Sequence, residues 1–157
     1  MPRKSFVSIL IVFALLFCCY APAEAAEQNG VVMNENVIHK LKDGSRLVEK
    51  PLIVLSRTTS YVTASKTYEY ENSDGVVEWS AKITGSFTYT GTTSFCTSSA
   101  CVTTVYSGNW HEAVNNASYA GNAAFASVTM ELKFLFIVIK THNVSLTLTC
   151  DANGNLS

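Results

Sequence analysis

The three cysteines Cys96, Cys101 and Cys150 are the residues whose type and spacing suggest chemistry most directly. If the tetrapeptide TSSA between Cys96 and Cys101 is a hairpin loop, these two thiols face each other, whereas a Cys96–Cys150 bridge would join distant segments. A redox pair needs Cys-x-x-Cys, and a zinc site needs a fourth ligand besides the nearby His111. We therefore predict structural cysteines, with one left over, and neither a metal nor another cofactor.

Acid–base and nucleophilic chemistry has little support elsewhere in the chain. The histidines His39, His111 and His142 lie in separate segments, and neither G-x-S-x-G nor H-E-x-x-H occurs. Glu69 and Glu71 are two positions apart and share one face of a strand, as a glycosidase pair or a cation site would require. A solvated strand face explains them more simply. We predict that the protein is not an enzyme.

Aromatic residues are frequent and could form a binding platform, because flat aromatic faces stack on sugar rings. Trp79, Phe87 and Tyr89 share one strand face and are expected in the core. The better candidates for an exposed binding surface are Trp110, Tyr68 and Tyr70.

Residues 134–139, FLFIVI, are the most apolar stretch after the N-terminal segment, and Lys133 and Lys140 bracket them. Strict alternation breaks here. One interpretation is a strand covered on both sides or a turn between the last two strands. The other is an exposed apolar tip around Phe136 that contacts a partner or a membrane.

These candidate residues lie on segments with a clear β pattern. In residues 77–89, VEWSAKITGSFTY, apolar and polar residues alternate with period two, and residues 128–134 and 144–150 repeat the pattern. Turn signals at 90–93, 107–109 and 120–122 separate the runs, and DANGN at 151–155 is expected to be a polar turn. We predict an all-β domain over 55–157, a single antiparallel sandwich of about seven strands, with an open barrel as the alternative.

The N-terminal part indicates export. A short basic start, an apolar core and small residues before Ala25 predict a signal peptide over 1–25. Residues 26–54 are expected to be a flexible arm or a marginal hairpin around the turn signal at 42–45. The rest of the chain has no apolar stretch long enough for a transmembrane span. The formal net charge of −1 argues against a nucleic-acid partner. The expected location is extracellular.

Residues 58–157 resemble an uncharacterised family of short secreted all-β proteins from Gram-positive, Clostridia-type bacteria. The resemblance rests on TASKTYEYENSDGVVEW, WSAKITGSFTYTGTTSFCT, the NW at 109–110 and the ending VSLTLTCDANGNLS. It implies a Cys96–Cys150 disulfide, with Cys101 as the odd thiol, and it implies no activity. We predict a secreted, non-enzymatic binding protein acting at the cell surface, with cell-wall components as candidate partners, or in the medium. The alternative is a small secreted antibacterial protein.

Overall fold

The computed structural model describes residues 36–157, and this part of the chain consists of β-strands and connecting turns. Its strands are β1 (Asn36–Lys40), β2 (Arg46–Glu49), β3 (Ile53–Arg57), β4 (Tyr61–Glu71), β5 (Val77–Tyr89), β6 (Ser94–Val105), β7 (Trp110–Ala120), β8 (Ala123–Phe134) and β9 (Ile137–Thr149). The predicted all-β class is confirmed. The seven strands from β3 to β9 agree with the seven or so expected over 55–157, and β1 and β2 precede them. The expected signal peptide and the first part of the arm, residues 26–35, lie outside the described residues.

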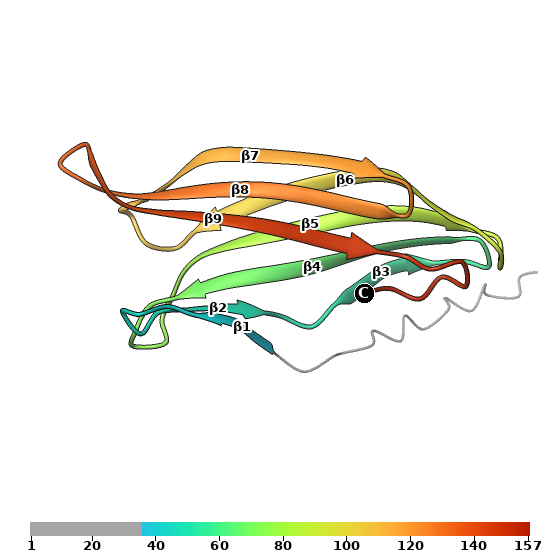
Figure 1. Cartoon of the computed structure of the whole chain (residues 1–157), viewed down its shortest axis with the longest axis horizontal. Helices are drawn as coiled ribbons and strands as arrows, with labels where there is room; N and C mark the ends of the chain where they lie inside the picture. Colours follow the sequence, from blue (N-terminus) through green and yellow to red (C-terminus); the bar gives the residue numbers. More distant parts are fainter. Residues whose placement is uncertain (1–35) are drawn as a thin grey trace, which may run out of the picture.

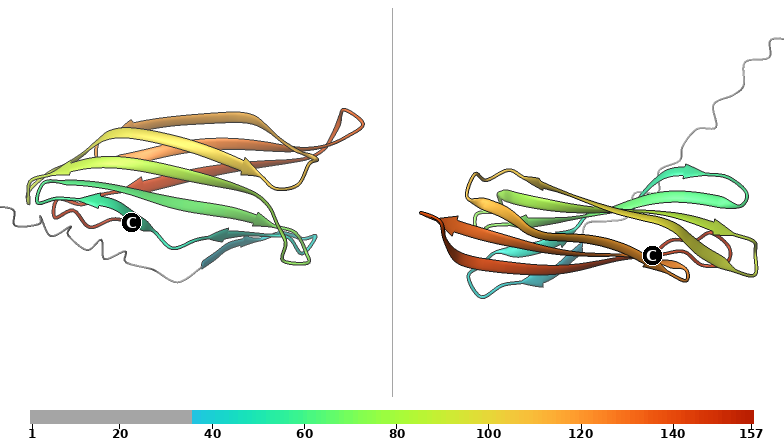
Figure 2. Two further views of the ribbon diagram at one scale, coloured as in Figure 1. Left: turned by 180° about the vertical axis from the view of Figure 1, so that it is seen from behind. Right: turned by 90° about the horizontal axis from the view of Figure 1, so that it is seen from above.

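The strands form two antiparallel sheets that pack as two layers (Figure 1). The larger sheet has the order β1-β2-β4-β5-β6, and β3 pairs with β4 on the same side as β2. The short strands share this edge because β3 pairs with residues 62–65 of β4 and β2 with residues 68–71. The smaller sheet has the order β7-β8-β9. Figure 2 shows the same two layers from behind and from above.

The core lies between β5 and the smaller sheet, and the alternation in β5 accounts for it. Trp79, Ile83 and Phe87 are fully buried on the inner face of β5, as predicted. Opposite them lie Val128 and Met130 of β8, together with apolar residues of β9. Full burial of each such side chain stabilises the fold by roughly 1.5–3 kcal/mol.

Gly85 in the middle of β5 provides space for a neighbouring ring. A Cβ at this position would lie 2.8 Å from the Phe87 ring and 3.1 Å from Cβ of Ala124 on β8. The Phe87 ring therefore occupies the volume that a side chain at residue 85 would need. Glycine here allows the two sheets to approach closely.

The polar ending of the chain forms the expected turn. The side chain of Asp151 accepts hydrogen bonds from the backbone N–H groups of Asn153 and Asn155, both at 2.8 Å. Gly154 has a φ of +83° and lies so close to the Tyr89 ring that a Cβ would come within 2.6 Å of it. The Gly154 carbonyl accepts a hydrogen bond of 2.7 Å from Arg57 on β3. The turn thereby fastens the end of the chain to the larger sheet.

The larger sheet begins earlier than the sequence predicted. β1 and β2 form a hairpin, closed by the Leu41 N–H, which donates to the Ser45 carbonyl at 2.8 Å. β2 then pairs with β4. The marginal hairpin around 42–45 is therefore part of the sandwich, and the sheet includes residues before the expected boundary at 55. Four-residue strands such as β2 carry too few alternating positions to be recognised without their partner.

Candidate functional site

The aromatic residues expected on the surface are buried instead. Trp110 and Tyr70 are each 2% exposed and Tyr68 is 7% exposed. Tyr68 and Tyr70 continue the inner face of β4 that begins with Val62, and Trp110 begins β7 where that strand enters the core. The expectation that these three residues form an exposed binding surface was therefore wrong.

Tyr70, Trp79, Trp110 and His142 form a compact group of rings between the sheets, which we call the Tyr70 cluster. Tyr70 stacks on Trp79 with ring centroids 5.4 Å apart and an interplanar angle of 6°. Trp110 meets Tyr70 edge-on at 5.3 Å, and its indole N–H donates a hydrogen bond of 2.7 Å to the Glu78 carboxylate. His142 tilts against Tyr70 at 4.7 Å. Such contacts add to the stability that burial provides.

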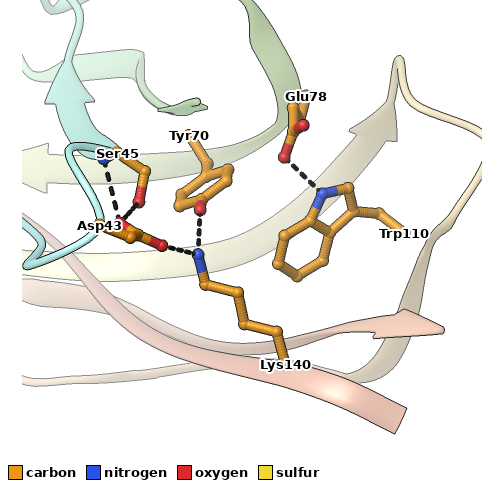
Figure 3. Close-up of polar contacts among 6 residues, drawn as sticks. All are labelled: Asp43, Ser45, Tyr70, Glu78, Trp110 and Lys140. Atoms are coloured by element: carbon orange, nitrogen blue, oxygen red, sulfur yellow. Dashed lines mark hydrogen bonds and ion pairs between the residues drawn. The ribbon is translucent and has the colours of Figure 1, made fainter. Parts of the chain in front are cut away.

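A lysine connects this cluster to the β1–β2 loop (Figure 3). Lys140 on β9 donates a hydrogen bond of 2.7 Å to the Tyr70 hydroxyl and forms an ion pair with Asp43. Asp43 also accepts hydrogen bonds from the backbone N–H of Ser45, at 3.0 Å, and from the Ser45 hydroxyl. The contact joins the larger sheet to the smaller one at the end of the molecule where β8 turns into β9.

The surroundings of Asp43, Lys140 and His142 shift the pKa of each group. The hydrogen bonds from Lys140 and Ser45 hold the pKa of Asp43 well below its usual value. Burial opposes the charge of Lys140, but hydrogen bonds to Asp43 and Tyr70 outweigh it and raise the pKa of this lysine. Burial, followed by the charge of Lys140, lowers the pKa of His142. At pH 7 these shifts favour an anionic Asp43, a cationic Lys140 and a neutral His142.

The remaining polar candidates are spread over the fold. Glu69 forms an ion pair of 3.1 Å with Lys50, and Glu71 is buried and paired with Arg46. His39 on β1 and His111 on β7 are exposed. Residues 36–157 contain no group of three or more His, Cys, Asp or Glu residues arranged to hold a metal ion.

The cysteines occupy different environments, and all three are free thiols in the structure. Residues 94–105 form the single strand β6, so TSSA is not a hairpin loop. Five residues of extended strand separate Cys96 from Cys101 by roughly 15 Å, far beyond the reach of a disulfide. Cys101 is partly buried, and burial followed by the Glu112 charge raises its pKa to about 11.

Cys96 lies on β6 of the larger sheet and Cys150 directly follows β9 of the smaller sheet, and both are buried. The Cys96 N–H donates to the Gly121 carbonyl at 2.8 Å, and the Cys150 N–H donates to the next carbonyl, that of Asn122, at 3.1 Å. Burial raises the pKa of both thiols, and the charge of Cys150 adds to the effect on Cys96. The β7–β8 turn thus holds both thiols at the same end of the sandwich.

Residues 134–139, which we call the hairpin tip, form the most exposed apolar element of the described chain. The tip joins β8 to β9 and is the outermost point at its end of the sandwich (Figure 1). Phe136 is 99% exposed and Leu135 is 74% exposed. The other four tip residues are also exposed: Phe134, Ile137, Val138 and Ile139. The segment forms the turn between the last two strands, which was part of the first alternative, and it is exposed, as the second alternative expected. Its contact with a partner or a membrane stays a prediction.

The turn within the hairpin tip has an unusual backbone for its residues. Phe134 pairs with Ile137, so Leu135 and Phe136 are the two central residues of a tight hairpin turn. Their φ angles are +47° and +69°. Two-residue turns of this kind prefer Asn-Gly or Gly-Gly, because side chains with a Cβ are strained at positive φ. The two most projecting side chains are therefore held in place against a conformational preference.

Basic residues surround the base of the hairpin tip. Lys133 precedes it on β8 and forms an ion pair of 3.1 Å with Glu131, and Lys140 follows it on β9. The contact of Lys140 with Asp43 brings the β1–β2 loop to the same place; the exposed Lys42 lies in this loop, and the exposed Lys40 ends β1 just before it. The sequence showed the lysines beside the tip, but nothing in it indicated that the β1–β2 loop would join them.

Comparisons with protein-family models, curated proteins and solved structures find no match to this chain. Among residues 36–157, no helix has the length and apolar character to cross a membrane.

Proposed function

We propose that this protein is a secreted, non-enzymatic binding protein that acts at the bacterial cell surface or in the medium, and that it binds through the hairpin tip. The observation that carries the proposal is the run of six exposed apolar residues at 134–139. Soluble proteins seldom leave such a contiguous apolar patch on a projecting element unless something covers it.

Three further features support this proposal. The N-terminal sequence has the composition of an export signal, and the resemblance to short secreted proteins of Gram-positive bacteria agrees with it. Of the ionisable groups that the fold brings together, Asp43 and Lys140 favour each other's charged form, and burial favours the neutral form of His142. The net charge of −1 disfavours nucleic acid as the partner.

Co-sedimentation with washed Gram-positive cells and with isolated cell walls tests the proposal. The mature protein is expected to pellet with at least one of them, and Leu135→Asn/Phe136→Gly is expected to stay in the supernatant. Phe95→Asn is the matched control, because it removes one exposed aromatic side chain from β6, away from the tip. Absence of wild-type protein from every pellet would contradict action at the cell surface and leave only action in the medium.

A second candidate is a small secreted antibacterial protein, which the combination of apolar tip and neighbouring lysines favours. Such a protein would slow the growth of competing strains, and Leu135→Asn/Phe136→Gly would abolish the effect. Unchanged growth at high concentrations of purified protein would exclude this candidate.

We also propose that Cys96 and Cys150 form a disulfide in the exported protein. Their burial and their attachment to consecutive carbonyls of the β7–β8 turn support the pairing. In the reaction, an extracellular low-molecular-weight disulfide exchanges with the two thiols. The new S–S bond forms while the reagent accepts two electrons and two protons and leaves as two thiols. Non-reducing peptide mapping is expected to find the Cys96–Cys150 link and a separate Cys101, and a link that includes Cys101 would contradict the assignment.

A further inference from the structure

We infer that the partner of the hairpin tip is a lipid bilayer with anionic headgroups, into whose interfacial region the tip inserts. This inference rests on the proposed function and names the partner of the same element. Three features carry it: the shape and paired backbone of the tip, the positions of the lysines, and the residues retained in the strained turn.

The shape of the hairpin tip fits a bilayer. Residues 134–139 form the end of a two-stranded hairpin, so apolar side chains point outward on both of its faces. A projecting hairpin with apolar side chains on both faces can bury all of them only where apolar material surrounds it, as acyl chains in a bilayer do. From Lys140 to the turn the strand extends about 10 Å, which matches the depth of interfacial insertion.

The backbone of the tip is prepared for an apolar medium. The register of the β8–β9 ladder shifts between Leu132 and Lys133, where Ile139 has no opposite residue, and pairing then resumes at Lys133–Val138 and Phe134–Ile137 up to the turn. Backbone polar groups that enter a bilayer must be satisfied within the protein, and a paired hairpin meets this requirement better than an open loop.

The charges lie where headgroups would be. Lys133 and Lys140 lie directly next to the tip in sequence. Lys42 lies in the adjoining β1–β2 loop, and Lys40 is the last residue of β1. Glu131 pairs with Lys133, and Asp43 pairs with Lys140. The four lysines and these two carboxylates together carry an excess of positive charge. Lysines at this depth extend their ammonium groups to anionic headgroups while their methylene chains cover apolar surface.

The turn residues provide the third argument. Leu135 and Phe136 occupy two positions at which Asn and Gly would relieve the backbone. Neither side chain is buried in the fold, so neither contributes to the core. Strain that the rest of the fold does not require is typical of a functional element. At these two positions, large apolar side chains can insert into the interfacial region of the bilayer.

Binding to protein-free vesicles tests the inference directly. The full mature protein is mixed with sucrose-loaded vesicles of phosphatidylcholine alone, or with about 30% phosphatidylglycerol, and sedimented. Wild-type protein is expected to bind the anionic vesicles, and Leu135→Asn/Phe136→Gly is expected to weaken binding at least about 100-fold. Phe95→Asn should bind like wild type. Lys42→Gln/Lys133→Gln should lose about five-fold for each lysine on anionic vesicles only.

A second readout places the tip within the bilayer. In Phe136→Trp, the new indole is exposed in solution, whereas the native Trp79 and Trp110 are buried. Brominated acyl chains are expected to quench the added fluorescence on binding, while the native signal of wild-type protein stays unchanged.

The outcomes separate this inference from the proposed function. Retention on cells or walls that depends on the tip, without binding to any vesicle, would overturn the lipid inference and leave the binding function intact. Concentration-dependent dimers that require the tip, with no vesicle binding, would identify a second copy as the occupant and overturn it as well. Vesicle binding unaffected by Leu135→Asn/Phe136→Gly would also overturn it.

Discussion

The two hairpin turns of the smaller sheet have the same length and opposite chemistry. Ala120 pairs with Ala123 at one end of β8, and Phe134 pairs with Ile137 at the other, so each turn has two central residues. The β7–β8 turn places Gly121 at a φ of +55°. The β8–β9 turn places Leu135 and Phe136 at positive φ instead.

The residues of the two turns differ in whether the chain reversal itself requires them. Gly121 meets its turn geometry without strain, and its carbonyl anchors Cys96. Leu135 and Phe136 give the same chain reversal at a cost of order 1–3 kcal/mol each. Since folding needs only the reversal, the bulky residues in the second turn indicate a selected surface. The predictions below test whether that cost is real and where it falls.

The largest effect is expected at the C-terminal turn, where a side chain at positive φ also lacks space. Gly154→Ala adds a Cβ within 2.6 Å of the Tyr89 ring at a φ of +83°, and should lower the free energy of unfolding by about 3 kcal/mol. Gly91→Ala is the matched control, because Gly91 has a φ of +87° with no atom near its added Cβ. It should cost only about 1 kcal/mol. Equal shifts in the urea midpoint would show that the Tyr89 contact is unimportant.

The next largest effect is a gain in stability at the hairpin tip. Leu135→Asn/Phe136→Gly installs the residues that a turn of this geometry prefers, and should raise the free energy of unfolding by about 2 kcal/mol. Urea denaturation measures the gain, and the vesicle assay measures the loss of binding on the same sample. Opposite signs for stability and binding are the signature of a functional surface. A destabilised variant would show that the side chains support the fold.

The reciprocal exchange on the β7–β8 turn should have a smaller effect. Gly121→Leu places a bulky residue at a φ of +55° with open space around its Cβ, so only backbone strain is added. The expected loss is about 1 kcal/mol by urea denaturation. Gly108→Leu is the control, since Gly108 also has open space around its Cβ but is not at positive φ. A loss at residue 121 no greater than at residue 108 would remove the strain argument from both hairpins.

The sequence predicted the strands in which apolar and polar residues alternate. The buried face of β5, including Trp79 and Phe87, follows directly from period two. β1 and β2 were expected only as a marginal hairpin or a flexible arm outside the sandwich, because such short strands gain their stability from pairing within the sheet. Their recognition requires the partner strand, which local sequence does not specify.

The candidate site was predictable only in part, for the same reason. The sequence marked residues 134–139 as apolar and left their exposure open, because burial depends on which strands lie above and below. Tyr70 and Trp110 were assigned to the surface, whereas the second sheet covers them. The Lys140–Asp43 contact joins residues 97 positions apart, and no local sequence pattern predicts such a contact.

The smallest effect concerns the pH dependence of the region behind the hairpin tip. His142 contacts Tyr70, and Lys140, Asp43 and His39 are the charged groups that act on it. Because burial lowers the pKa of His142 below its ordinary 6.5, the unfolded chain takes up this proton first as the pH falls. Stability is therefore complete above pH 6.5 and declines below it. The pKa of Asp43 is lowered from 3.8, so its own contribution is lost only at more acidic pH.

Urea unfolding between about pH 7.5 and 5 isolates the contribution of His142 to stability. His142→Phe keeps the ring contact without a proton and should flatten this decline, and an unchanged decline in that variant would assign it to other groups.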